Sequence, residues 1–557
     1  MGSTPNKPPT PPTPGRERLI EQFKVDGLNI MFGNPGTVEQ GFLDAVDAAE
    51  DFHYILALQE TVAAGIADGY ARATGGAALL QLHSGVGLGN GIGMLYQSLR
   101  GHTPLVVVAG DAGVRYDAMD AQMAADLVAM ARPVTKYATR VTDPNSVLRT
   151  IRRAVKIALT PPRGPVFVAL PMDVLDELNS EPVLPATVPL TDVAPSAASV
   201  GQAARLLASA ERPVVLIGDG VSLSGAQREL AAVAELLGAD VYEVDSSEVN
   251  IPASHPLRRG QTGHMFGPHS KELVADADGV LIVGTYVFPE VFPELASPFR
   301  EGARIVHIDL NAYEIAKNHP VDLGLAADPR EALRALAGVL ERELTPQRRA
   351  AAAARLEVRT RERAREALAA PPAPEDGTPM AVFLRTLAER TRGDLIVFDE
   401  ALTTSPLVTR HLPAERPGDY HLTRGGSLGI GFPGAVGVKL ARPDRLVVGF
   451  AGDGGSMYTY QALWTAARHG IHAKFVVCNN RKYRLLDDNI AQYWRERDIA
   501  AHEFPGSFDL SHPEIDFAGL ARSLGAGGMR VEKPDEAVAA VGRMIAHPGP
   551  FLVDIQI

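Results

Sequence analysis

Two apolar runs near the C-terminal end of the chain lead directly into short polar motifs. The run 446–450 precedes Gly452-Asp453-Gly454, and the run 475–478 precedes Asn479-Asn480, so that residues 455 to 478 separate the two motifs. Neither run alternates polar with apolar residues, which is typical of parallel strands covered on both faces. The chain is therefore expected to place two polar motifs at the ends of two buried strands.

The residue types of these motifs suit a phosphate group and a divalent cation. Gly454 and Gly455 have no Cβ, so their backbone N–H groups can approach phosphate oxygens. Asp453 and the Asn480 amide offer hard oxygen ligands, and Mg²⁺ takes few such protein ligands because phosphate and water supply the rest. A tight turn would explain Gly-Asp-Gly alone, but the second motif at this spacing favours a cofactor site.

Composition excludes several classes of function. The formal net charge of −12 and a pI of about 5.7 disfavour nucleic acid and anionic membranes as main partners. The single cysteine, Cys478, rules out an intrachain disulfide and lies in an apolar run, where a structural thiol is expected. No apolar run is long enough to span a bilayer, and residues 1–15 lack the apolar stretch of a secretory signal. A cytoplasmic protein is expected.

Apolar runs separated by helical patterns recur along the chain and predict an α/β fold of doubly wound parallel sheets. The expected strands are 54–58, 78–82, 105–109, 166–170, 214–217, 280–283, 305–308, 395–398, 446–450, 475–478 and 551–555. Composition shifts divide the chain into a Pro-rich tail expected to be disordered or extended (1–15), an N-terminal domain (16–184), a middle domain (197–344), a linker with an exposed helix (345–376) and a C-terminal domain (377–557).

Several longer stretches resemble one enzyme family in the same order. They are Phe32-Gly33-Asn34-Pro35-Gly36-Thr37-Val38-Glu39, Tyr54-Ile55-Leu56-Ala57-Leu58-Gln59-Glu60, Gly65-Ile66-Ala67-Asp68-Gly69-Tyr70-Ala71, Leu82-His83-Ser84 and Ala462-Leu463-Trp464-Thr465-Ala466-Ala467. Together with the two C-terminal motifs they resemble the thiamine-diphosphate-dependent 2-oxo-acid decarboxylase and acetohydroxyacid synthase superfamily, and within it the benzoylformate decarboxylase branch. The resemblance covers nearly everything after the N-terminal tail.

The resemblance implies three domains and a cofactor. The N-terminal domain would hold the pyrimidine ring of thiamine diphosphate, and the C-terminal domain would hold its diphosphate with Mg²⁺. The middle domain binds FAD in some members, so FAD is not expected but is not excluded. Active sites in the family form between two chains, which implies a homodimer or homotetramer with a small 2-oxo acid as substrate.

The same resemblance assigns catalytic residues. Glu60 would contact a pyrimidine nitrogen of the cofactor and favour its imino tautomer, which is general acid–base work through the cofactor. A residue that complements a helix dipole is the alternative for Glu60. His83 matches an active-site histidine, although a core histidine remains open. Thr37 stands where the family has a catalytic serine, so a hydroxyl is kept and a methyl is added.

Cofactor-binding residues follow in the C-terminal domain. Gly426 would accept a hydrogen bond from the cofactor amino group, and Leu428 would support the bent cofactor from below; a glycine-rich turn before a helix is the alternative. Thr403 and Thr404 would donate to the diphosphate or cap a helix. The assigned cofactor-binding set is Glu60, Thr403, Thr404, Gly426, Leu428, Asp453, Gly454, Gly455, Asn480 and Tyr483, and the metal-binding set is Asp453, Asn480 and the backbone carbonyl of Lys482.

Two departures concern the substrate. A second active-site histidine of the benzoylformate decarboxylases aligns with Val291, which cannot transfer a proton. The charged stretch 487–503 also differs from the family, in which this region packs over the substrate. It indicates a polar substrate, a mobile lid or a solvated surface helix.

The predicted function is thiamine-diphosphate-dependent decarboxylation of a 2-oxo acid through an enamine, which is then protonated or attacks a second carbonyl. The alternatives are a carboligase of the acetohydroxyacid synthase type and a non-catalytic relative that only binds cofactor. Intact Glu60, Asp453 and Asn480 argue against the last of these.

Overall fold

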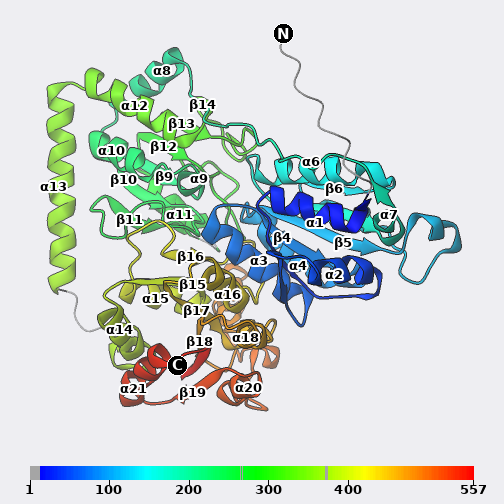
Figure 1. Ribbon diagram of the computed structural model, residues 1–557. Coiled ribbons are helices and arrows are strands. Elements are labelled where there is room, and N and C mark those ends of the chain that lie inside the picture. The colour runs from blue at the N-terminus through cyan, green and yellow to red at the C-terminus, as the bar shows by residue number, and fades with distance from the viewer. Residues whose placement is uncertain (1–12, 264, 266, 370–373) are drawn as a thin grey trace, which may run out of the picture. The chain divides into compact units, whose positions relative to one another are not determined.

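The computed structural model describes residues 13–263, 265, 267–369 and 374–557, and Figure 1 traces the chain through them. The chain forms two compact units. The first comprises the residues up to Pro189 together with Thr378–Val408 and Thr423–Ile557, and the second comprises Leu190–Gly377 and Thr409–Leu422. The first unit contains an N-terminal and a C-terminal sheet, and the second contains the middle sheet.

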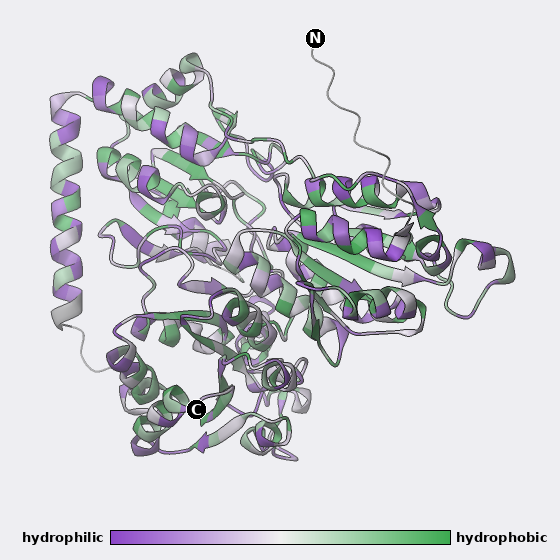
Figure 2. Ribbon diagram, viewed as in Figure 1, coloured by the Kyte–Doolittle hydropathy of each residue, from purple (hydrophilic) through white to green (hydrophobic). Residues whose placement is uncertain are grey.

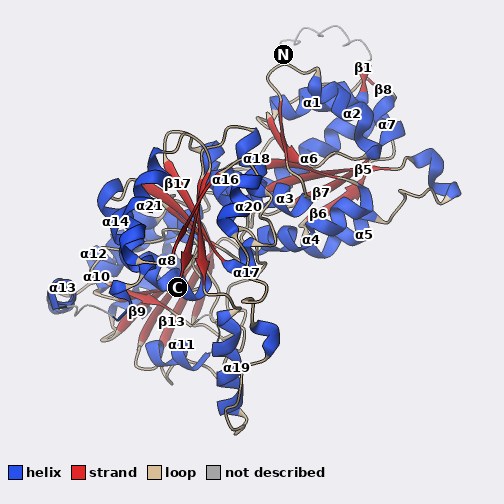
Figure 3. Cartoon of the chain, turned by 90° about the horizontal axis from the view of Figure 1, so that it is seen from below, coloured by secondary structure: helices blue, strands red, loops and turns tan. Residues whose placement is uncertain are grey.

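The N-terminal sheet is parallel throughout, in the order β3-β2-β4-β5-β7-β6. Its strands are β2 (Ile30–Gly33), β3 (His53–Leu56), β4 (Ala78–Leu82), β5 (Leu105–Asp111), β6 (Tyr137–Arg140) and β7 (Val166–Pro171). One face is covered by α1 (Gly15–Val25), α2 (Gln40–Asp47), α6 (Val147–Leu159) and α7 (Met172–Asp176), and the other by α3 (Glu60–Thr74), α4 (Ser84–Arg100) and α5 (Leu127–Ala131) (Figure 3). The central strands are hydrophobic along their length (Figure 2), as strands covered on both faces must be.

The C-terminal sheet repeats this topology. Its strands in the first unit are all parallel and lie in the order β15-β17-β18-β20-β19. When the strands of each sheet are numbered by their place in the sequence, this order is the same as β2-β4-β5-β7-β6 in the N-terminal sheet. They are β15 (Leu395–Glu400), β17 (Leu446–Gly452), β18 (Lys474–Asn479), β19 (Gly527–Val531) and β20 (Phe551–Gln556). The helices are α14 (Pro379–Thr391), α15 (Ser405–His411), α16 (Gly431–Ala441), α17 (Asp453–Ser456), α18 (Ala462–Arg468), α19 (Arg484–Glu496), α20 (Phe517–Ser523) and α21 (Pro534–Ala546).

The two sheets of the first unit share a hydrophobic core, and α3 packs directly on α16. Glycines make this contact possible. A Cβ at Gly69 would lie 2.1 Å from the carbonyl oxygen of Gly434, and a Cβ at Gly437 would lie 2.0 Å from that of Ile66. The two helices occupy equivalent places in the two sheets: α3 precedes β4 and α16 precedes β17, and each of these strands is the third of its sheet in sequence order.

The middle sheet has a different order, β11-β10-β9-β12-β13-β14, the arrangement of a dinucleotide-binding fold. The elements of the second unit are β9 (Pro213–Ile217), β10 (Asp240–Glu243), β11 (Arg258–Gln261), β12 (Gly279–Val283), β13 (Arg304–Asp309), β14 (Leu323–Ala326), β16 (Tyr420–Leu422), α8 (Ala197–Ala208), α9 (Gly220–Leu223), α10 (Gln227–Leu237), α11 (Gly267–Val274), α12 (Pro329–Glu343) and α13 (Pro346–Ala369).

The ends of the two central strands of the middle sheet bond to each other. The N–H of Gly220, after β9, donates to the carbonyl of Gly284, after β12, at 2.9 Å. A Cβ at Gly284 would lie 2.7 Å from the Cα of Gly220. The two strand ends therefore touch at the point where the strand order reverses, which is the usual ligand position of this topology.

The expected linker helix is α13, and arginines hold it to the second unit. Arg355 donates to the carbonyls of Leu237 and Gly238 at the end of α10, and Arg348 donates to that of Ser209 just after α8. Cations are favourable there because the last carbonyls of a helix lack partners within the helix.

The predicted fold class, three doubly wound parallel-sheet domains, is confirmed, and the apolar runs expected to be strands lie on strands, except that the run 54–58 extends two residues beyond the end of β3. Of the strands that the sequence did not indicate, β6 and β19 are edge strands with half-buried or polar residues, whereas β2 and β10 lie inside their sheets. At the start of the described chain, Thr13–Pro14 pairs as β1 with β8 (Leu178–Asn179). The rest of the expected tail, 1–12, and the Pro-rich stretch 370–373 lie outside the described residues. Among the helices of the described chain, none is both long and apolar enough to cross a bilayer.

Candidate active site

The polar residues singled out in the N-terminal part of the chain gather between β2 and β4, where the strand order of the N-terminal sheet reverses. Glu39 lies in the short helix 37–39 after β2, and His83 directly follows β4. His83 Nδ1 is 2.9 Å from Glu39 Oε2, and the Gly110 N–H donates to Glu39 Oε1 at 2.9 Å. We call this edge of the first unit the N-terminal edge.

Glu39 is a functional candidate that the sequence reasoning did not assign, although it ends the matching stretch 32–39. It is only 4% exposed, and burial raises the pKa of its carboxyl group, while His83 and the Gly110 N–H oppose that shift. When Glu39 is ionised its carboxylate can only accept, so Nδ1 of His83 would then donate to it and Nε2 would face away from this pair.

Thr37 and His83 are brought together by a glycine. A Cβ at Gly36 would lie 1.9 Å from His83 Nδ1, so the imidazole rests directly on the backbone next to Thr37. Thr37 is exposed, whereas the His83 side chain is 13% exposed. The exposed Thr37 thus follows directly on the glycine against which the imidazole packs.

Glu60 is the first residue of α3 and is 6% exposed. Asn90 of α4 donates to its Oε2 at 3.0 Å. A Cβ at Gly87 would lie 2.8 Å from Glu60 Oε1 and 3.1 Å from the Cβ of His83, so both predicted catalytic residues flank the same glycine. A dipole-complementing residue does not have to be buried, since an exposed acidic side chain in the first turn also stabilises a helix, so the burial of Glu60 and its contact with Asn90 are what the dipole role leaves unexplained.

A second group of polar residues lies between β15 and β17, at the equivalent reversal in the C-terminal sheet, which we call the C-terminal edge. Asp453 follows β17 and is 5% exposed. Its Oδ1 accepts from the Gly454 N–H at 2.7 Å, but Oδ2 has no hydrogen-bond partner among the described residues. Burial raises the pKa of the Asp453 carboxyl group, and the N–H groups of Gly454, Arg481 and Lys482 oppose this.

Asn480 and its neighbours complete this edge. The Asn480 Oδ1 accepts from the Lys482 N–H at 3.0 Å and retains a second lone pair. The Tyr483 ring covers Gly454, where a Cβ would lie 2.3 Å from the ring. The Lys482 side chain points into an ion pair with Asp487, with Nζ and Oδ2 2.6 Å apart, so its backbone carbonyl is what it can offer a metal.

The loop 425–429 stands beside Asp453. Gly425, Gly426 and Gly429 have φ values of +67°, +75° and +96°, conformations that favour glycine. Gly426 is exposed, and Leu428 is half-buried with a methyl 4.0 Å from a Cβ built at Gly455. The turn needs these glycines whether the loop binds a cofactor or is only a glycine-rich turn before a helix. The loop also places Leu428 beside the turn predicted to bind the diphosphate.

Thr403 and Thr404 follow β15 in the short helix 402–404. Thr403 is exposed, and Thr404 is buried with its hydroxyl bonded to the Cys478 thiol. Burial raises the pKa of Cys478 well above its usual value, which suits a structural thiol and not a nucleophile. Of the two threonines, Thr403 is the one free to meet a ligand in this structure.

Strained backbone marks both edges. Ser84, Leu402 and Arg481 have φ values of +44°, +51° and +58°, although none is glycine. They follow β4, β15 and β18, the strands that carry His83, the threonine pair and Asn480. Such strain persists where the surrounding structure fixes a functional geometry.

These residues fit the diphosphate and cation that the sequence predicted. The buried, unpartnered Asp453 Oδ2 and the free lone pair of Asn480 are hard oxygen donors of the kind Mg²⁺ takes. Among the residues that the structure describes there is no group of three or more His, Cys, Asp or Glu side chains able to hold a metal by themselves. A site completed by phosphate and water needs no such group.

Val291 and the charged stretch 487–503, the two departures from the family pattern, lie in different surroundings. Val291 is 55% exposed, while the neighbouring Glu290 is 6% exposed with neither carboxylate oxygen bonded to a described residue. The charged stretch 487–503 begins in α19, which buries Asp487 and Trp494 and leaves most of its charged side chains exposed. Helix α19 is thus a surface helix, and its buried Asp487 is an additional polar candidate beside Lys482.

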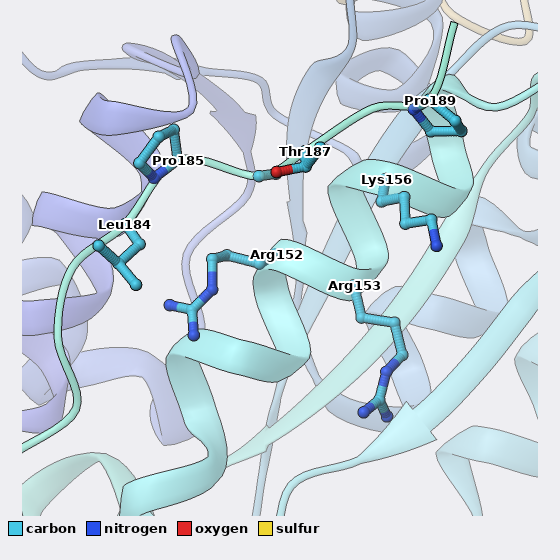
Figure 4. Close-up of a pocket in the computed structure, with 8 residues that line it drawn as sticks. Arg152, Arg153, Lys156, Leu184, Pro185, Thr187 and Pro189 are labelled. Carbon is cyan, nitrogen blue, oxygen red and sulfur yellow. The ribbon is translucent and has the colours of Figure 1, made fainter. Parts of the chain in front are cut away.

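A pocket of about 560 Å³ elsewhere in the first unit does not belong to either edge. It lies between α6 and the segment 184–189, and Figure 4 shows Arg152 reaching toward Leu184 while Arg153 points away from that segment. Ligand sites need polar groups that converge. These cations diverge, and no predicted site residue lines the pocket.

The three-sheet fold is that of a known class of enzyme. Models of the thiamine pyrophosphate (thiamine diphosphate) enzymes match the chain in three segments: the N-terminal TPP binding domain at residues 14–130, the central domain at 200–336 and the C-terminal TPP binding domain at 403–555. The chain belongs to this family.

Individual relatives span the whole chain. Benzoylformate decarboxylase of Pseudomonas aeruginosa is 30% identical over 547 residues, covering 96% of this chain and 97% of that protein. A probable acetolactate synthase large subunit of Methanocaldococcus jannaschii is 29% identical and covers 98% and 92%. The structure of thiamine diphosphate-dependent 4-hydroxybenzoylformate decarboxylase from Rhodococcus jostii RHA1 superposes with a TM-score of 0.84 at 28% identity, covering 98% of this chain and 99% of that one. The family is thereby shown, and both decarboxylases and synthases are among the relatives.

Proposed function

We propose that the protein is a thiamine-diphosphate- and Mg²⁺-dependent enzyme that decarboxylates a 2-oxo acid of the benzoylformate type. The observation that carries the proposal is the pairing of two buried carboxylates at equivalent edges: Glu60 beside His83, and Asp453 with an oxygen left for a cation. When bound, thiamine diphosphate supplies the carbon nucleophile and the electron sink that the loss of CO₂ requires.

Each edge has its own task in this proposal. Asp453, Asn480 and the Lys482 carbonyl would hold Mg²⁺, and Gly454, Gly455 and Thr403 would receive the diphosphate, with Tyr483 covering the turn. Gly426 and Leu428 would hold the rings. Glu60 would face a ring nitrogen of the cofactor, and its buried carboxyl group would hold or release the proton there. The His83–Glu39 pair moves a proton to or from the substrate, and the Thr37 hydroxyl orients the substrate carboxylate.

A carboligase of the acetolactate synthase type is the second candidate. It is favoured by Val291, an aliphatic residue where the benzoylformate branch has a histidine, because fewer proton donors leave more time for a second carbonyl to react. The acetolactate synthase relatives agree with this alternative. A non-catalytic role is disfavoured because Glu60, Asp453 and Asn480 all occupy buried or half-buried positions at the two edges.

Three further expectations accompany the proposal. Exposed apolar side chains near the N-terminal edge, Val86 (63%) and Met119 (76%), suit burial against a second copy in a homodimer or homotetramer. FAD is not expected and is not excluded; purified protein without flavin absorbance is the expected result. The buried thiol and net charge of −12 fit a cytoplasmic enzyme.

The direct experiment is a screen of purified protein with thiamine diphosphate and Mg²⁺ against aryl and alkyl 2-oxo acids, with products identified by mass. CO₂ release with an aldehyde product supports the decarboxylase. Product only in the presence of a second carbonyl compound supports the carboligase. No turnover with any 2-oxo acid, in protein shown to bind the cofactor, contradicts both.

A further inference from the structure

Glu400 is a buried carboxylate at the C-terminal edge that the proposed function does not use. It is the last residue of β15, is 1% exposed, and lies between two loops of the first unit. Its Oε1 accepts from the N–H of Gly429 and its Oε2 from that of Gly431. A buried charge is tolerated only where such hydrogen bonds compensate for lost water.

The same carboxylate also touches the turn that follows β17. A Cβ at Gly455 would lie 3.1 Å from Glu400 Oε1. Leu428 is the next nearest side chain to that point. One carboxylate therefore contacts both the loop 425–429 and the turn 453–456, and Leu428 lies beside the second of these contacts.

Thr459 holds the loop from the opposite side. Its hydroxyl, fully buried, donates to the Gly429 carbonyl at 2.5 Å. Both polar groups of the Gly429 peptide are thus fixed by side chains of different elements. Gly429 also has a left-handed φ of +96°, and a Cβ there would lie 2.7 Å from the Cβ of Tyr458.

We propose that Glu400 is a positioning residue, which together with Thr459 fixes the loop 425–429 against the turn 453–456 so that the site accepts the rings of its cofactor and not merely its diphosphate. The proposal rests on the proposed function, since the cofactor is thiamine diphosphate there. It assigns no contact between Glu400 and the cofactor; the effect passes through the backbone of Gly429 and Gly431.

The alternative is that Glu400 only stabilises the fold. The two roles separate when two ligands are compared at pH 8 with saturating Mg²⁺: thiamine diphosphate, which has rings, and inorganic diphosphate, which has none. In Glu400→Gln, one amide N–H₂ would face a backbone N–H instead of accepting from it. We expect the affinity for thiamine diphosphate to fall by about 10- to 100-fold, as for other supporting residues behind a ligand site. The affinity for inorganic diphosphate should change by less than about threefold, since the turn itself is intact.

Matched controls exist in the same chain. Glu243→Gln changes a buried glutamate at the end of β10 in the second unit, and Thr465→Val changes a buried threonine of α18 whose hydroxyl has no partner among the described residues. Both should leave both affinities unchanged. Thr459→Val should reproduce the selective loss of Glu400→Gln, and it serves as the test if Glu400→Gln does not fold. Glu400→Asp keeps the charge and should retain part of the selectivity.

Amide hydrogen exchange supplies a readout that needs no cofactor. The peptide containing Gly429 and Gly431 should exchange faster in Glu400→Gln and Thr459→Val than in the two controls. Equal losses for the two ligands, or exchange no faster than in the controls, would overturn the positioning role and leave the proposed function standing. Wild-type protein that binds inorganic diphosphate but not thiamine diphosphate would instead overturn the proposed function itself.

Discussion

The N-terminal and C-terminal sheets have the same strand order but opposite chemistry at the same place. Both reverse their order between their first and third strands in sequence, β2 and β4 in one and β15 and β17 in the other. The N-terminal edge carries a histidine and two buried glutamates, His83, Glu39 and Glu60. The C-terminal edge carries glycines and hard oxygen donors.

This difference shows that topology provides the crevice while individual residues decide its use. Proton exchange needs an imidazole or carboxyl group whose pKa is tuned by its surroundings, whereas holding a diphosphate needs bare backbone and a cation ligand. The middle sheet makes the same point by contrast, since at its reversal point Gly220 and Gly284 bond to each other through their backbones. Changes at the N-terminal edge should therefore alter turnover, and changes at the C-terminal edge should alter binding.

The largest effect is expected at Glu60. Glu60→Gln keeps the shape and the Asn90 contact but removes the exchangeable proton, so turnover should fall by about 10²- to 10⁴-fold. Cofactor affinity measured by calorimetry should stay close to that of the wild type. Near-wild-type turnover would reject the catalytic role of Glu60. Loss of cofactor binding would contradict the expectation that the N-terminal edge affects turnover and the C-terminal edge affects binding.

Asp453→Ala should have the opposite signature. Loss of a supporting residue behind a metal site typically lowers affinity by about 10- to 100-fold, and loss of a cation ligand itself should lower it further. The affinity for thiamine diphosphate at limiting Mg²⁺ should therefore weaken by more than about 100-fold. Excess Mg²⁺ should restore part of it, and a chelator should abolish cofactor binding in the wild type. Unchanged affinity in the variant at limiting Mg²⁺ would show that the cation lies elsewhere.

The C-terminal edge should also give the apo protein a pH signature. Burial raises the pKa of Glu400 to about 7 from an ordinary 4.5. Between these values the native state keeps a proton that the unfolded state releases, so the free energy of unfolding should fall as pH rises from about 4.5 to 7, by up to roughly 3 kcal/mol from this group.

The check is the thermal midpoint of apo wild type and Glu400→Gln between pH 5 and 7.5. Asp554, whose pKa burial raises to about 6, contributes a similar trend to both proteins, so the difference between them isolates Glu400. Parallel curves for the two proteins would refute the assignment of this trend to Glu400.

The His83–Glu39 pair should act as one unit at the N-terminal edge. In a double-mutant cycle of His83→Ala and Glu39→Gln, the two losses of kcat should not add, with a coupling of about 0.5–3 kcal/mol. The Gly110 contact is retained in Glu39→Gln through the amide oxygen, which limits structural damage. Additive losses would mean that Glu39 supports the backbone and does not tune the imidazole.

The smallest effect is expected at Val291. If the N-terminal edge supplies the proton for product release, an added imidazole should shift product ratios only severalfold, toward simple aldehyde release and away from carboligation. The measurement is the product ratio of wild type and Val291→His with one 2-oxo acid and a fixed acceptor aldehyde. Equal ratios, or more ligation in the variant, would return Val291 to a packing role.

The sequence by itself determined the layout of strands and the family. Buried parallel strands are recognisable because each must be apolar along its length, and the glycine, aspartate and asparagine motifs mark strand ends where backbone and hard donors meet a ligand. Family resemblance then assigned Glu60, His83 and Asp453, which the structure brings to two equivalent edges. The sequence did not indicate edge strands such as β6, because their half-buried residues form no continuous apolar run.

Only the tertiary structure revealed the supporting residues. Glu39 meets His83 across 44 positions of sequence, and Glu400 meets Gly429 across 29, so no local pattern could pair them. Both are acidic residues that a sequence alone places on the surface by default, because burial of a carboxylate is costly without partners. The partners are backbone N–H groups and an imidazole supplied by other elements of the fold, and only folding brings them together.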